Sequence, residues 1–189
     1  MTRIVFEDVS KIYGDRPRQV QDAMALLRQN VPSDEIFART GCRVGLRHIS
    51  LEIPSGGIFC VIGLSGSGKS TLVRHINRLI EPSCGRIQAC DIDVTALDAR
   101  GLREFRRARV SMVFQHFGLL PHLTVMQNTC FGLRVRGLSA KEQRERAYHW
   151  LREMELADMA DSYPEQLSGG MRQRVGLARA LTADTDIIL

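Results

Sequence analysis

Long apolar runs are missing from this sequence of 189 residues. No stretch reaches the ~18 consecutive apolar residues that a membrane-spanning helix requires, so we expect none within these residues. The opening segment, MTRIVFEDVS, also lacks the apolar centre of a secretory signal peptide. With 44% hydrophobic and 25% charged residues, the composition instead predicts one folded domain with material for a smaller subdomain.

Cysteine is sparse and unclustered, which argues against disulfide-rich and zinc-binding folds. The five cysteines stand at positions 42, 60, 84, 90 and 130. Neither the odd number nor the spacing suits a disulfide framework or pairs of metal ligands. We therefore interpret them as free thiols in a reducing compartment. His116 and His122 lack a second ligand cluster, so we assign no metal site to them either.

The net charge of +5 raises the question of a nucleic-acid partner. The densest basic segment is ARGLREFRRARV, residues 99–110. Its arginines would go all round a helix, which is typical of a solvated helix face. The chain also lacks the aromatic interleaving that single-strand binders use, so we expect no nucleic acid among the partners.

The first motif with a chemical meaning is IFCVIGLSGSGKST, residues 58–71. Its apolar start, Ile58–Ile62, predicts a central parallel strand, and TLVRHINRL, residues 71–79, predicts a helix. Between them, residues 63–70 fit the pattern G-x-x-x-x-G-K-[ST]. Strand, glycine loop and helix form the context that a phosphate-binding loop needs.

The residue types in this loop suit a nucleoside triphosphate. Gly63, Gly66 and Gly68 permit unusual dihedrals and let backbone N–H groups approach the phosphates closely. The following helix would direct its N-terminus at them, a contribution of about 0.3–1 kcal/mol per charge. Lys69 would reach the β- and γ-phosphates, and Ser70 would ligate Mg²⁺. The predicted ATP-binding residues are Gly63, Ser65, Gly66, Ser67, Gly68, Lys69, Ser70 and Thr71.

A second anion-binding pattern is LSGGMRQR, residues 167–174. Ser168 stands where a helix N-cap belongs, Gly169 and Gly170 leave the first turn bare, and VGLARAL continues the helix. A bare helix N-terminus beside a serine hydroxyl favours an anion, although the chain already has one phosphate cradle.

LSGGMRQRVGLARAL resembles the signature motif of ABC-type ATPases, and GLSGSGKST resembles their phosphate loop. In that family two ATPase subunits pair head to tail, and the signature of one closes over the γ-phosphate held by the other. The resemblance implies a homodimer and an α/β P-loop fold, with a RecA-like parallel-sheet core, an N-terminal antiparallel β subdomain and a helical subdomain. The residues implied at the partner's ATP are Leu167, Ser168, Gly169, Gly170 and Met171.

Two further positions gain a role from the same resemblance. SMVFQ, residues 111–115, is a short apolar strand pattern, and Gln115 at its end would touch Mg²⁺ and the attacking water. Tyr13, in SKIYG, matches the place of an aromatic residue that stacks on adenine, an interaction of about 1–3 kcal/mol. The alternatives are an exposed loop glutamine and a tyrosine at the edge of the core.

Residues 116–164 are predicted to form a mainly helical subdomain. Ser139 and Glu142 have capping-box spacing, and Trp150 lies in an apolar stripe that indicates subdomain core rather than a ligand site. In ABC ATPases of transporters, the stretch resembling HFGLLPHLTV helps to form the groove for a coupling helix of the permease. The resemblance places Phe117, Leu119, Leu120, Pro121 and His122 near that groove, with packing inside the subdomain as the alternative.

A helical insertion is predicted over residues 15–44. Val20, Met24 and Leu27 can share one helical stripe, and a second short helix would start near Ser33 and stop at Gly41. With NRLIEP and SYPEQLSGGMRQRVGLARAL, the insertion resembles ATPase subunits of bacterial importers for glycine betaine, proline and related quaternary amines. These relatives usually carry Asp-Gly where this chain has Cys90-Asp91, so local backbone strain is expected there.

The chain ends with LTADTDIIL, residues 181–189, an apolar strand pattern. In the family, the matching strand leads to an aspartate that holds Mg²⁺ through water and a glutamate that activates water, with a γ-phosphate-sensing histidine further on. All three would lie beyond Leu189. The resemblance therefore implies one incomplete ATPase domain over residues 1–189 that aggregates and hydrolyses ATP poorly, because loss of a general base costs about 10²–10⁴-fold in rate.

The predicted function is that of the ATPase subunit of an osmoprotectant importer, bound peripherally at the cytoplasmic face of the membrane. ATP would close the dimer and hydrolysis reopen it, and the motion would pass to a permease that meets an external substrate-binding protein. Those two proteins would select the amine. The alternatives are a non-catalytic nucleotide-binding regulator, an ATPase of another importer subclass, and a soluble ABC ATPase acting on DNA or ribosomes.

Overall fold

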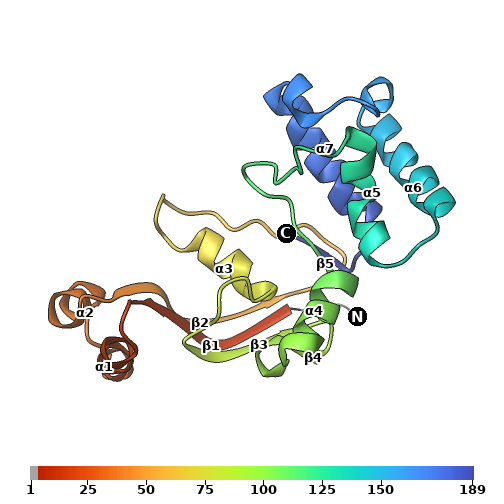
Figure 1. The fold of residues 1–189 in the computed structure, drawn as a ribbon. Coiled ribbons are helices and arrows are strands. Elements are labelled where there is room, and N and C mark those ends of the chain that lie inside the picture. The colour runs from red at the N-terminus through yellow and green to blue at the C-terminus, as the bar shows by residue number, and fades with distance from the viewer. Residues whose placement is uncertain (1–3) are drawn as a thin grey trace. The chain divides into compact units, whose positions relative to one another are not determined.

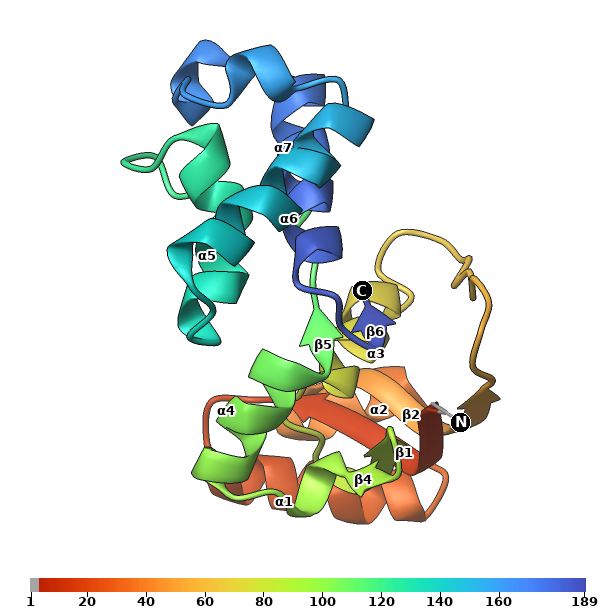
Figure 2. The same cartoon turned by 90° about the vertical axis from the view of Figure 1, so that its right-hand side faces the viewer.

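The computed structural model describes residues 4–189, which divide into two compact units between Leu102 and Arg103. Figure 1 shows the elements of both units, and Figure 2 shows them from the side. None of the helices within residues 4–189 is long and apolar enough to cross a membrane. All five cysteines are free thiols.

The first unit is built on a four-stranded antiparallel sheet with the strand order β2-β1-β3-β4 (Figure 1). The strands are β1 (Ile4–Tyr13), β2 (Arg43–Ile53), β3 (Cys84–Ala89) and β4 (Ile92–Asp93), and a 3₁₀ turn, η1 (Val94–Ala96), follows β4. Phe6 and Val9 on the central strand β1 are buried, as is Ile87 on β3. The predicted N-terminal antiparallel subdomain is thus confirmed.

Two helices stand between β1 and β2, where the sequence predicts them. The helix α1 (Pro17–Arg28) begins with a proline, which suits a first helical position, and α2 (Ser33–Thr40) ends at a left-handed Gly41 with φ 73°. Their apolar faces share one buried cluster with the end of β1, made of Ile12, Ala23, Met24, Leu27, Ile36 and Cys42.

The strand predicted over Ile58–Ile62 is wrong. Residues 58–64 have no regular secondary structure, and the side chains of Ile58 and Ile62 are 97% and 92% exposed. A β-strand needs a neighbour that completes its backbone hydrogen bonds, and none of the strands within residues 4–189 pairs with this segment. The helix that follows, α3 (Lys69–Ile76), is also shorter than predicted.

The second unit combines a short parallel ladder with helices. Its elements are the second half of α4 (Ala99–Ala108), β5 (Val110–Ser111), α5 (Val125–Val135), α6 (Ala140–Glu153), the 3₁₀ turns η2 (Ala157–Met159) and η3 (Pro164–Gln166), α7 (Gly169–Thr182) and β6 (Ile187–Ile188). The strands β5 and β6 pair in parallel, and the Val113 N–H extends the ladder to the Leu189 carbonyl at 2.8 Å. The strand predicted at the end of the sequence is therefore present.

The helical core of this unit lies between α5, α6 and α7 (Figure 1). The buried residues of this core are Val125, Met126, Ala147, Leu151, Leu156, Leu167, Val175 and Ala178. Trp150 packs partly buried against it, which confirms the interpretation as core. The capping box predicted for Ser139 and Glu142 starts α6, and a second one starts α5.

The turn between β3 and β4 carries the strain expected at Cys90-Asp91. Both residues are left-handed, with φ 53° and 61°, and the flanking Ala89 and Ile92 pair across the hairpin. A two-residue hairpin loop with two positive φ angles is the conformation that favours Asn-Gly or Asp-Gly.

Replacing Asp91 with glycine should therefore stabilise the first unit. We expect Asp91→Gly to raise the free energy of unfolding by about 0.5–1 kcal/mol, because relief of the left-handed strain exceeds the extra chain entropy of glycine. Urea denaturation followed by circular dichroism measures the change. Asp22→Gly in the interior of α1 is the control and should lower stability. If both variants lose stability, the turn is not strained.

Candidate functional site

The phosphate loop of the first unit turns at glycines that no other residue could replace without strain. Gly66 and Gly68 have φ angles of 82° and 90°. A Cβ added to Gly68 would lie 2.6 Å from the carbonyl oxygen of Gly45 on β2. The loop therefore approaches the sheet closely at the point where α3 begins, and glycine is required there.

Lys69, the first residue of α3, is folded back onto the loop. Its ammonium group donates hydrogen bonds to the carbonyl oxygens of Gly63 at 2.8 Å and Leu64 at 2.6 Å. Ser70 follows with an exposed side chain at the start of the helix. A cation, a hydroxyl group and a helix N-terminus thus meet at one exposed loop, and this combination fits a triphosphate with Mg²⁺.

Tyr13 lies beside the phosphate helix although the two are far apart in the sequence. Its hydroxyl group is 3.1 Å from the Thr71 hydroxyl oxygen. The ring packs so closely on Gly45 that a Cβ there would lie 2.5 Å from it, and the Lys11 ammonium is 5.2 Å from the ring centroid. The side chain remains 40% exposed. The structure therefore brings Tyr13 to the predicted nucleotide-binding residues.

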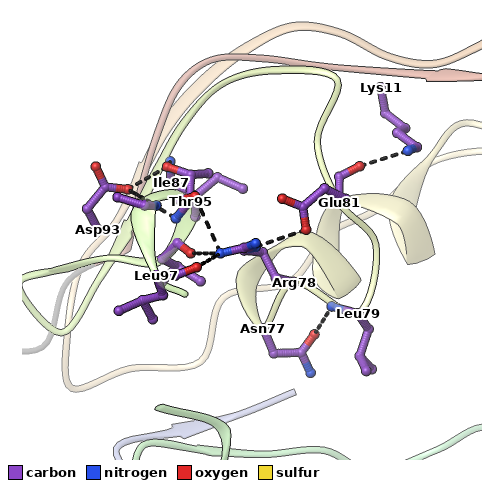
Figure 3. Close-up of polar contacts among 11 residues, drawn as sticks. Lys11, Asn77, Arg78, Leu79, Glu81, Ile87, Asp93, Thr95 and Leu97 are labelled. Atoms are coloured by element: carbon purple, nitrogen blue, oxygen red, sulfur yellow. Dashed lines mark hydrogen bonds and ion pairs between the residues drawn. The ribbon is translucent and has the colours of Figure 1, made fainter. Parts of the chain in front are cut away.

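Arg78 anchors the far end of α3, and the sequence analysis missed it (Figure 3). Its Nη1 donates to the carbonyl oxygens of Val94 at 2.8 Å and Leu97 at 2.7 Å, while its Nε donates to the Glu81 carboxylate at 3.0 Å. The Glu81 carbonyl in turn accepts from Lys11 at 2.8 Å. The only sequence signal was a polar pair, Asn77-Arg78, inside the helix predicted over residues 71–79.

His75 is buried on the inner side of α3. Its Nδ1 bonds to the Thr71 carbonyl at 2.6 Å, whereas Nε2 has no hydrogen-bond partner among residues 4–189. Burial is the largest effect and lowers the pKa of His75 below its ordinary 6.5, the hydrogen bond to Thr71 opposes this, Lys11 lowers the pKa further, and Glu81 opposes. The ring is therefore neutral at pH 7 and donates through Nδ1.

The buried ring makes stability depend on pH. Because the pKa of His75 is lower in the folded state, the unfolded chain binds more protons below about pH 6.5, and stability rises with pH through that window. We expect the free energy of unfolding to fall below pH 6.5, by at most about 1.4 kcal/mol per pH unit for one proton. Denaturation between pH 5 and 8 measures it. His75→Gln should remove this component, whereas His122→Gln, at an exposed position, should leave it.

The signature segment of the second unit presents an open helix N-terminus. The Ser168 hydroxyl accepts from the Met171 N–H at 3.3 Å and caps α7, as predicted. Gly169 and Gly170 are exposed, and a Cβ on either would meet nothing within 4 Å. Leu167 is buried in the helical core and Met171 packs against it. This segment is therefore anchored in the helical core, while its first turn is exposed to solvent.

Gln115 lies four residues beyond the end of β5, in a loop that turns sharply. Its side chain is exposed, and the turn is closed by hydrogen bonds from Phe117 N–H to the Phe114 carbonyl at 2.9 Å and from Gly118 N–H to the His116 carbonyl at 2.6 Å. Gln115 and the signature segment belong to the second unit, and Tyr13 and the phosphate loop belong to the first.

Asn128 fixes the next part of this loop, and the sequence analysis missed it. Its fully buried amide donates to the carbonyl oxygens of Leu120 at 3.0 Å, Leu123 at 2.9 Å and Thr124 at 3.0 Å, and accepts from the Leu120 N–H at 2.8 Å. A polar residue on the buried face of α5 was the available signal. The amide gives an irregular segment the backbone partners that a helix or sheet would supply.

A groove of about 720 Å³ runs between the second half of α4, the Gln115 loop, α5 and α7 within the second unit. Apolar side chains, among them Phe114, Phe131 and Val135, form part of its wall. The basic residues along it are Arg103, Arg106, Arg107, Arg136 and Arg179, against one acidic residue, Glu104. Its shape and charge suit an apolar segment that carries negative charge.

The five residues that the sequence analysis placed near a permease groove, Phe117, Leu119, Leu120, Pro121 and His122, lie in different surroundings. Leu120 lines the groove, whereas Leu119 packs against the helical core. Phe117 lies under the guanidinium of Arg172, and Pro121 and His122 are exposed.

Comparison with protein families and relatives agrees with this arrangement. A family model described as "ABC transporter" matches residues 46–189. The glycine betaine/proline betaine transport system ATP-binding protein ProV of Escherichia coli is 46% identical over 99% of this chain, which covers 46% of that protein. The glycine betaine transport ATP-binding protein OpuAA of Bacillus subtilis is 46% identical over 99% of the chain, which covers 44% of it. The chain spans about half the length of the curated relatives it matches.

Solved structures show the same fold. The ATP-binding cassette MJ0796, in a dimeric post-hydrolysis state bound to ADP and Pi, superimposes with a TM-score of 0.80 at 31% identity, covering 98% of this chain and 72% of that one. A second dimeric structure of MJ0796, described as a bacterial ABC transporter cassette, gives a TM-score of 0.79 at 32% identity. The ABC cassette fold predicted from the sequence is confirmed, and the chain belongs to the ABC transporter family of ATP-binding proteins.

Proposed function

We propose that this chain is the nucleotide-binding part of the ATPase subunit of an importer for glycine betaine, proline or a related quaternary amine. The observation that carries the proposal is that one chain holds two exposed, serine-bearing helix N-termini, at α3 and at α7. The relatives ProV and OpuAA are named as transport proteins for glycine betaine, which supports the substrate class.

The first N-terminus would hold the triphosphate. The backbone N–H groups of residues 63–68 would surround it, and Lys69 would exchange its two carbonyl acceptors for phosphate oxygens. Ser70 and Gln115 would ligate Mg²⁺, and Tyr13 would stack on the adenine. Thr71 would flank the metal while its hydroxyl group holds Tyr13.

The second N-terminus would serve the ATP of another copy of the chain. The first turn of α7 is open at Gly169 and Gly170, so a phosphate could approach the bare N–H groups without a steric obstacle. Ser168 would add a hydroxyl group. The solved relative is dimeric with ADP and Pi, which supports a head-to-tail homodimer as the working unit.

The groove of the second unit would receive a segment of the permease at the cytoplasmic face of the membrane. The arginines along it supply the charge that a segment with acidic side chains requires. The permease in turn would meet an external binding protein that delivers the amine.

ATP hydrolysis by these 189 residues alone is proposed to be slow. Gln115 can position water, but a carboxylate general base is also required, and Asp186, the acidic residue beside β6, is engaged at 2.8 Å by Arg109. A nucleotide-binding regulator without hydrolysis is therefore the second candidate. ATP-dependent association with turnover no faster than that of Lys69→Ala would favour it.

Self-association with ATP tests the proposed function. We expect Mg·ATP to shift the chain from monomer to dimer in analytical ultracentrifugation. Lys69→Ala should lose nucleotide binding and dimerisation together. Gly170→Asp should bind nucleotide normally but fail to dimerise, because its carboxylate would repel the phosphate of the other copy while the open space at this position preserves the fold. Nucleotide binding by Lys69→Ala equal to that of the parent would refute the proposal, and Gly170→Ala is the steric control.

The groove can be tested separately. Val135 lines it and is 50% exposed, so Val135→Glu should leave nucleotide binding intact while it weakens association with the co-expressed permease by about tenfold or more, because a charge replaces apolar contact. Co-purification in detergent measures the association. The control is Tyr148→Glu, an equally exposed position on α6 outside the groove. Equal losses in the two variants would argue against docking here.

A further inference from the structure

Arg179 on α7 donates hydrogen bonds to two consecutive residues of the irregular loop after β5. Its Nη1 donates to the Gly118 carbonyl at 2.7 Å, and its Nη2 donates to the Phe117 carbonyl at 3.1 Å. Phe117 and Gly118 are consecutive left-handed residues, with φ 61° and 57°. A phenylalanine in this conformation is uncommon and persists only where its surroundings hold it.

The same face of α7 makes two further contacts with this loop. Arg172 places its guanidinium 5.6 Å from the centroid of the Phe117 ring. A Cβ added to Gly176 would lie 3.5 Å from the Phe117 carbonyl oxygen. Positions 172, 176 and 179 have the spacing of one helix face. This part of α7 therefore faces residues 117 and 118.

Arg179 is an unusual residue for such a contact because its charge is partly removed from water. Burial lowers the pKa of its guanidinium below the usual value. Within residues 4–189, its hydrogen bonds go to main-chain carbonyls and none to a carboxylate. Burying a cation against two neutral carbonyls costs more than a surface ion pair would, which is consistent with a role for this geometry beyond stability.

Arg179 lies next to three parts of the second unit with proposed functions: the Gln115 loop, the signature helix and the groove. Gln115 is two residues before Phe117, and the bond from Phe117 N–H to the Phe114 carbonyl closes the turn around it. Ser168 caps the same helix that carries Arg179. Arg179, Gly118 and Phe114 all line the groove.

We propose that Arg179 is a positioning residue that couples the Gln115 loop to the signature helix. A displacement of Gln115, or of the groove wall, would pass through the two carbonyls and the guanidinium to α7 and so to Ser168. The position of Ser168 in one copy, and with it the binding of the other copy's ATP, would then depend on the position of Gln115 in the first copy. We call the two hydrogen bonds from Arg179 to the Phe117 and Gly118 carbonyls the Arg179 clamp. The clamp rests on the geometry alone. The roles of Gln115 and Ser168 rest on the proposed function.

Amide hydrogen exchange of the chain, with and without Mg²⁺ and β,γ-imido-ATP, tests both the hydrogen bonds of Arg179 to the loop and the coupling of the loop to α7. Without nucleotide, Arg179→Ala should exchange about tenfold faster than the parent at residues 116–120, because it loses two charge-assisted hydrogen bonds. With nucleotide, the parent should change exchange at residues 63–71, 112–120 and 167–175. Arg179→Ala should keep the first two responses and lose the third. If Arg179 had a merely structural role, Arg179→Ala would keep or lose all three responses together.

Two further variants make the test specific. Arg179→Lys keeps the charge but reaches one carbonyl at a time, so it should give intermediate basal exchange and a partial response at residues 167–175. Arg47→Ala is the matched control, since Arg47 also donates to a main-chain carbonyl, that of Val31 at 2.8 Å, but belongs to the first unit and lies outside the proposed sites. It should keep all three responses.

The outcomes separate the two proposals. Unchanged basal exchange at residues 116–120 in Arg179→Ala would overturn the clamp, whatever the nucleotide does. A preserved response at residues 167–175 in Arg179→Ala would overturn the coupling. A parent that shows no response at residues 63–71 does not bind nucleotide, and that result counts against the proposed function while the basal comparison still decides the clamp.

Discussion

The structure depends on keeping the first turns of two helices, α3 and α7, open to solvent, although Ser168 caps one N–H of α7. The other first N–H groups of a helix can bind phosphate if the helix is held by its sides and its far end. In the first unit, Arg78 ties the end of α3 to carbonyls near η1, and the buried His75 bonds along its inner face. In the second unit, the helical core holds α7 through Val175 and Ala178. Both N-termini remain exposed as a result.

Part of the basic composition is used for bonding inside the fold. Several of the cations bond to main-chain carbonyls at the ends of irregular segments. Arg174 bonds to Met154, Arg136 to Ala183, and Arg47 to Val31 at 2.8 Å. Each supplies a hydrogen bond that a carbonyl outside regular structure would otherwise lack. Part of the positive charge thus serves as internal bonding, and this part includes Arg136 and Arg179, two of the arginines along the groove.

The sequence predicted those features whose causes are local. Caps at Ser139 and Ser168, the left-handed Gly41 and the strained pair after β3 each follow from a few adjacent residues, and the structure has them. The strand over residues 58–62 failed because pairing is non-local, and an apolar run alone does not supply a neighbour. Arg78, Asn128 and Arg179 were missed for a related reason. Most of their partners are main-chain carbonyls, which every residue has, so the sequence offers at most a polar residue at a helix position and does not identify the partner.

The phosphate loop is positioned by contacts on its helix side. Gly66 and Gly68 hold left-handed conformations, and the Lys69 ammonium donates to the Gly63 carbonyl oxygen. Gly68 sits against β2, and β2 belongs to the antiparallel sheet rather than to a parallel core. The cradle is therefore shaped from its helix side, by α3 and the sheet behind it, so the elements that anchor α3 are the ones on which nucleotide binding depends.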